Sequence, residues 1–128
     1  MAVGILAGYA IGAQLAPGTR TELLNVELEG LPGKEAHLYT IELAPGFASP
    51  RHWHPGHYFA YVVEGSGFVE EEGRARIPLT AGAPYYVHSE AGKPAYWHVT
   101  GNASATLPLK MVVVLIADKG QPITHFDK

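Results

Sequence analysis

The sequence of 128 residues contains no cysteine. Disulfide bonds and thiolate metal sites are therefore excluded, and histidine, which occurs seven times, becomes the main candidate for a metal ligand. The chain also lacks a Gly-X-Ser-X-Gly turn and a phosphate-binding loop. The usual sequence signals of serine hydrolases and of P-loop nucleotide chemistry are thus absent.

Charge is scarce as well. Only 16% of the residues are charged, the formal net charge is −3, and no run of basic residues occurs. We therefore expect neither nucleic acid nor an anionic membrane surface as a partner. The hydrophobic content of 47% is typical of a folded globular chain, and the length fits one domain.

The N-terminal segment, residues 1–20, is apolar and rich in small residues, and residues 2–19 carry no charge. It resembles the apolar part of a signal peptide without the basic start, which predicts a periplasmic or secreted protein. The alternatives are a short helix or strand that packs on the domain, and a cytoplasmic location. The segment is too short and too rich in glycine to predict a membrane span.

No long amphipathic helical pattern and no internal repeat is found. After Arg20, short strand-like segments alternate with turn residues, which predicts an all-β sandwich or barrel in one domain, residues 21–128. The apolar run at 111–116 predicts a strand that is covered on both faces. The expected strands span residues 23–29, 35–43, 58–64, 68–72, 74–79, 85–88, 96–100 and 109–117.

The strongest signal for chemistry is the His52-Trp53-His54 segment. Two histidines that are two residues apart on an extended chain point to the same side. Their imidazoles can converge on one metal ion. A histidine pair of this kind is common, so its surroundings decide how much weight it carries.

Those surroundings resemble the first signature motif of the cupins, a glycine, five residues, His-X-His, three residues, glutamate, six residues and glycine. Here Gly46 and Gly65 occupy the two glycine positions, and Tyr58 stands in the glutamate position. The second cupin motif is matched in part, by Gly82 and by His98 followed after three residues by Asn102. The chain thus resembles the small bacterial cupins of the cupin-2 type, over roughly residues 21–128.

This resemblance implies a double-stranded β-helix, or jelly-roll barrel. It also implies that His98 faces His52 and His54 inside the barrel. One divalent transition metal, Fe, Mn, Ni, Cu or Zn, would be bound by the three imidazoles, with coordination positions left for water, oxygen or substrate. The alternative is a polar pocket in which the histidines bind no metal.

Three further residues are candidates near that metal. Tyr58 replaces an anionic ligand with a neutral hydroxyl and is predicted to act in catalysis, the alternative being an aromatic residue that only fills the barrel. His57 is an alternative fourth ligand, although strand alternation places position 58 on the metal side. His88 replaces the usual proline of the second motif and is predicted as a proton-transfer group, or else as a loop histidine.

The predicted function is a metal-dependent enzyme, dioxygenase-like, that acts on a small organic molecule. The alternatives are a module that binds or senses a metal or small ligand without turnover, and a metal-dependent lyase or isomerase. The resemblance also implies a homodimer. Cupins host all these activities, so the fold alone does not select among them.

The remaining polar residues have structural interpretations. His37 and His125 lack any motif and are predicted at the surface. The run Glu70 to Glu72 is predicted as a solvated hairpin tip, and Asn102 is predicted to brace a turn.

Overall fold

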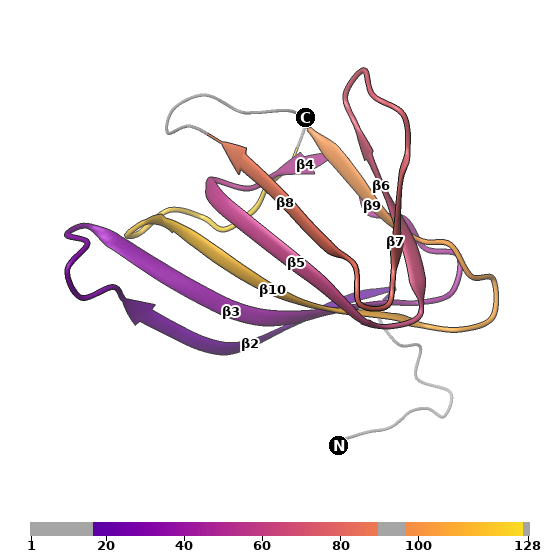
Figure 1. Cartoon of the computed structure of the whole chain (residues 1–128), viewed down its shortest axis with the longest axis horizontal. Helices are drawn as coiled ribbons and strands as arrows, with labels where there is room; N and C mark the ends of the chain where they lie inside the picture. Colours follow the sequence, from indigo (N-terminus) through magenta and orange to yellow (C-terminus); the bar gives the residue numbers. More distant parts are fainter. Residues whose placement is uncertain (1–16, 90–96, 127–128) are drawn as a thin grey trace.

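The computed structural model describes residues 17–89 and 97–126, which form two antiparallel five-stranded sheets (Figure 1). One sheet contains, in spatial order, β2 (Gly18–Glu27), β3 (Lys34–Leu43), β10 (Leu109–Asp118), β5 (Gly56–Glu64) and β8 (Pro84–Ser89). The other contains β11 (His125–Phe126), β4 (His52–Trp53), β9 (His98–Asn102), β6 (Ser66–Glu71) and β7 (Ile77–Thr80). The described residues contain no helix, and the predicted all-β jelly roll is confirmed.

The core lies between the two sheets, and β10 contributes most to it. Leu109, Val113 and Leu115 alternate with half-buried neighbours and are fully inaccessible to solvent. Burying one such side chain contributes about 1.5–3 kcal/mol. The prediction that this strand is covered on both faces is wrong, because Val112 and Val114 on its outer face are only half-buried. An antiparallel sheet can leave one face in water even where its sequence is apolar throughout.

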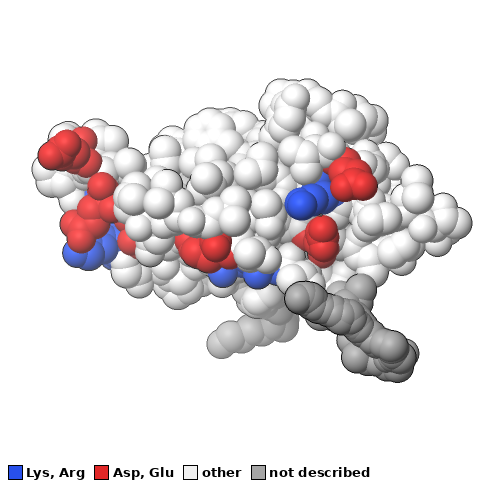
Figure 2. Space-filling view, turned by 90° about the horizontal axis from the view of Figure 1, so that it is seen from below, with Lys and Arg blue, Asp and Glu red and all other residues white. Residues whose placement is uncertain are grey.

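β3 follows the predicted alternation, whereas β2 differs from its prediction. β2 begins at Gly18 rather than at Leu23, and all of its residues are exposed. Residues 1–16 lie outside the described residues, and so does most of the segment before β9. No described helix is long and apolar enough to cross a membrane. Charged side chains occur in small mixed groups on the face shown in Figure 2, with wide uncharged areas between them.

Two features fix the chain near the site. Gly56 has φ = 80°, and a Cβ at this position would lie 2.1 Å from the carbonyl oxygen of Ile116, so no other residue fits this close approach. Asn102 donates from its amide nitrogen to the carbonyl oxygens of Leu43 and Leu107, at 3.0 Å and 2.8 Å. Its amide oxygen accepts from the backbone N–H of Ser104. The predicted bracing role of Asn102 is thus confirmed.

Candidate metal centre

Three histidines form a compact, buried group between the sheets. His52 begins β4, His54 follows the end of β4 directly, and His98 begins β9. Each offers one ring nitrogen as a ligand atom, and these atoms all lie within 4.8 Å of one another. The structure therefore brings together the three residues that were predicted as metal ligands.

Backbone pairing explains why these residues meet. His52 and His98 stand directly opposite each other where β4 pairs with β9, and their ring centroids are 4.4 Å apart. His54 is two residues further along the extended chain and projects to the same side. Its ring centroid lies 5.0 Å from that of His52 and 5.2 Å from that of His98.

Hydrogen bonds orient two of the rings. Nδ1–H of His52 donates to the carbonyl oxygen of Pro50 at 2.7 Å, and Nδ1–H of His54 donates to that of Ile123 at 2.8 Å. A carbonyl can only accept, so the proton is on Nδ1 in both rings, and Nε2 keeps its lone pair. Such bonds fix the tautomer and the ring orientation of metal-binding histidines.

Three of the other ring nitrogens in this group have no hydrogen-bond partner among the described residues. Nε2 of His54 and both ring nitrogens of His98 are buried without a hydrogen bond. Buried polar atoms normally have a partner, and leaving one unpaired costs about 1–3 kcal/mol. A divalent metal at the centre of the group would bind one nitrogen of each ring, including Nε2 of His54 and one of the two nitrogens of His98, so the donor set fits the ion that the cupin resemblance implies.

The electrostatic environment keeps the imidazoles neutral. Burial lowers the pKa of His54 to about 3 and that of His98 to about 2, with further lowering from the neighbouring histidines. Burial also lowers the pKa of His52 below its ordinary value. Neutral imidazole is the form that binds a metal.

Tyr58 lies beside this group. Its ring is buried and stacks on His54, with centroids 4.1 Å apart and planes inclined by 12°. Burial raises the pKa of the phenol well above its ordinary value. Position 58 thus faces the histidines, as strand alternation predicted, and it carries a neutral hydroxyl.

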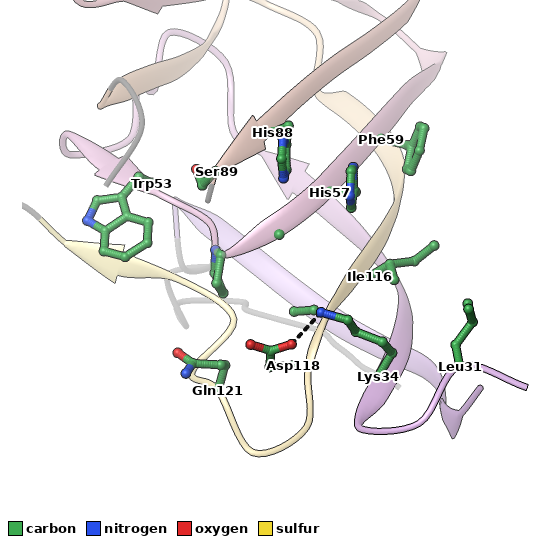
Figure 3. A pocket seen from close by; sticks show the side chains of 13 residues that line it. Leu31, Lys34, Trp53, His57, Phe59, His88, Ser89, Ile116, Asp118 and Gln121 are labelled. Atoms are coloured by element: carbon green, nitrogen blue, oxygen red, sulfur yellow. Dashed lines mark hydrogen bonds and ion pairs between the residues drawn. The ribbon is translucent and has the colours of Figure 1, made fainter. Parts of the chain in front are cut away.

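His57 and His88 lie on the opposite face of the sheet and do not join the group. Their rings stack at 4.1 Å, and Nδ1 of His57 is 2.8 Å from the Tyr86 hydroxyl. Both line an outer hollow of about 450 Å³ that Figure 3 shows from close by. The three buried histidines do not line that hollow, because side chains of consecutive strand residues point to opposite faces.

A separate cavity of about 340 Å³ opens beside the buried group. His52 and Tyr58 form part of its lining. Apolar walls come from Ile41, Leu43, Phe47, Met111 and Phe126. We take this cavity, rather than the larger outer hollow, as the candidate binding site, since it alone among the described cavities is next to the histidine group. Its size suits a small organic molecule.

Sequence reasoning placed three polar residues wrongly. Glu71 was predicted at a solvated tip, but it is 6% exposed and accepts a hydrogen bond from Tyr85. His37 was predicted at the surface but is buried between Glu22 and Glu35. His125 is half-buried and stacks on Trp53 at 4.0 Å. For Glu71 the sequence did contain a signal, because residues 69 and 71 lie two apart on one strand, and Glu71 therefore points to the same face as the apolar Val69.

These features define a small antiparallel β-barrel with a buried three-histidine site. The model of the cupin domain matches residues 39–115, which is more than half of the chain. The chain therefore belongs to the cupin family.

Solved structures agree on the fold. A cupin-like protein from Thermotoga maritima has a TM-score of 0.65 and 20% identity, covering 86% of this chain and 75% of that one. Oxalate oxidase in complex with glycolate has a TM-score of 0.61 and 21% identity, and the match covers 86% of this chain and 55% of that one. The DMSP lyase DddQ from Ruegeria pomeroyi has a TM-score of 0.64 and 20% identity, and the match covers 90% of this chain and 56% of that one. The chain thus spans about half the length of the two enzymes. No curated protein sequence matches it.

Proposed function

We propose that this cupin is a metal-dependent enzyme with dioxygenase-like chemistry, acting on a small organic molecule bound in the 340 Å³ cavity. The observation that carries the proposal is the convergence of buried, unpartnered imidazole nitrogens beside that cavity. A divalent metal bound there would supply Lewis acidity, or redox capacity, and coordination positions for substrate oxygens.

The residues of the chain have separate roles in this proposal. His52, His54 and His98 hold the metal, and the Pro50 and Ile123 carbonyls hold two of the rings in place. Tyr58, in the cavity lining, keeps its proton at neutral pH and can donate a hydrogen bond to a substrate oxygen. The apolar walls exclude water from the bound molecule.

The lining also suggests which compounds to examine first. Arg20 is the one charged residue among the described residues that line the cavity, although it also pairs with Glu22. A guanidinium has five donor hydrogens, so one acidic partner does not exhaust them. Small organic acids, including enolisable and aromatic ones, are therefore the first substrate class to screen.

The experiment is oxygen uptake by the iron-loaded protein in the presence of such acids, measured with an oxygen electrode. We expect uptake that depends on substrate and is lost in His98→Ala, with His88→Ala as the matched control on the outer face. Binding should also change the absorption spectrum of the loaded protein.

A lyase or isomerase is the second candidate, supported by the similar TM-scores of the fold to a DMSP lyase, 0.64, and to oxalate oxidase, 0.61. Substrate conversion without oxygen uptake would favour it. No uptake, no conversion and no spectral change across the iron, manganese, copper and nickel forms would reject both enzymatic proposals and favour a binding module.

A further inference from the structure

The metal site proposed above lacks the carboxylate that the family motif places at position 58. Inside the barrel, however, a different carboxylate is present. Among the described residues only Glu35 and Glu71 are buried acids, and Glu35 is engaged with His37 and with the backbone of Gly120. Glu71, with 6% exposure, is the buried acid on β6, the strand that pairs with β9.

Glu71 stands directly opposite His98 in the β6–β9 pairing. Residues opposed in this way have Cβ atoms about 4.5–5.5 Å apart, and both of these side chains are buried on the inner face. Tyr85, which donates to Glu71, has its ring centroid 6.3 Å from that of His98. The carboxylate is therefore a close neighbour of one predicted ligand.

Both oxygens of Glu71 are already bonded. Oε2 accepts from the Tyr85 hydroxyl at 2.5 Å, and Oε1 accepts from Nη1 of Arg74 at 3.3 Å. These bonds hold the carboxylate in place, and it is not part of the ligand group formed by the three histidines. Glu71 can thus act on a bound ion through its charge, without direct coordination.

The position of Glu71 matters because a buried carboxylate near the histidines would offset the positive charge of a bound metal. A divalent metal on three neutral imidazoles carries two uncompensated positive charges in the interior, and Tyr58 adds no negative charge. Burying a carboxylate is costly unless a positive charge compensates it, and the 3.3 Å pair with the solvent-exposed Arg74 side chain compensates Glu71 only in part. We propose that Glu71 supplies the negative charge at the metal centre that Tyr58 does not, positioned by Tyr85.

The first experiment measures metal affinity. In Glu71→Gln the affinity for cobalt, determined by competition with a chelator, should fall about tenfold or more. Glu70→Gln, which removes an exposed carboxylate one residue away, should leave it unchanged. Tyr58→Glu combined with Glu71→Gln should recover the affinity, because it moves the charge to the family position.

The second experiment distinguishes loss of the negative charge from distortion of the site. The distinction is needed because the hydrogen bond from Tyr85 to Glu71 also joins β8 to β6. Azide binding is followed by the visible spectrum of the cobalt-loaded protein at saturating metal. Loss of the negative charge should tighten azide binding in Glu71→Gln, whereas a distorted site would weaken it. Tyr85→Phe should lower the melting temperature but retain the charge, and with it most of the metal affinity.

This inference rests on the proposed metal site, and the two can fail separately. If the native chain binds no metal, the metal site itself is rejected. If the native chain binds cobalt and Glu71→Gln binds cobalt and azide as the native chain does, the role of Glu71 is overturned while the three-histidine site stands. Equal losses of affinity in Glu71→Gln and Tyr85→Phe would also overturn it, in favour of a purely structural bond.

Discussion

At the scale of single residues, Tyr58 sets this chain apart from the motif that it otherwise matches. Where the motif has a carboxylate, this chain has a tyrosine ring that stacks on His54. Burial raises the pKa of the Tyr58 hydroxyl, so the residue remains neutral. The sequence predicted both the side that position 58 faces and its neutrality. The stacking contact could not be predicted, because it depends on the ring orientation that the Ile123 carbonyl imposes on His54.

We expect Tyr58→Glu to tighten metal binding, because a carboxylate next to His54 would add an anionic ligand. Tyr58→Phe should keep the metal and lose only the hydrogen bond from the hydroxyl. Chelator competition gives the affinities, and the cobalt spectrum reports the ligand set. An unchanged affinity and spectrum in Tyr58→Glu would mean that this side chain does not reach the metal.

At the scale of elements, the long strands were predictable and the short ones were not. β3 alternates along its length and β10 contains the apolar run 111–117, so their sequence pattern identifies them. β4 and β11 have two residues each and are strands only through their pairing, β4 with β9 and β11 with β4. The inner position of Glu71 was missed because three consecutive acids usually indicate a solvent-exposed segment. The alternation along β6, which places Glu71 on the same face as Val69, points the other way.

β2 presents an unpaired edge among the described residues. It is exposed along its whole length and includes Leu24 and Val26, which are 50% and 39% exposed. An exposed apolar edge strand is a template for pairing with another chain. We propose that two copies associate along β2.

Sedimentation should therefore give the native protein twice the mass of one chain. Leu24→Lys with Val26→Lys should give single chains, because lysine on an edge opposes strand pairing. Val63→Lys, at an exposed apolar position on β5, is the control and should remain paired. A native protein that sediments as a single chain would contradict this proposal.

At the scale of the whole molecule, the pairing of β4 with β9 brings three histidines together at one point between the two sheets, which no single segment could provide. Strand alternation predicted that His52 and His54 point to the same side, and the resemblance to the cupins implied that His98 faces them. The sequence did not predict which residues line the cavity, whose walls come from β2, β3, β10, β11 and the segment around Phe47. Those walls depend on how the sheets twist across each other, which a linear pattern does not record.

The central claim is that His52, His54 and His98 together hold one metal ion. Its most direct test is elemental analysis of the protein purified from its native host, alongside His98→Ala and His88→Ala. We predict about one divalent transition metal per chain in the native protein and in His88→Ala, and little in His98→Ala, because two imidazoles bind far more weakly than three. Full metal content in His98→Ala, or none in the native protein, would contradict the account.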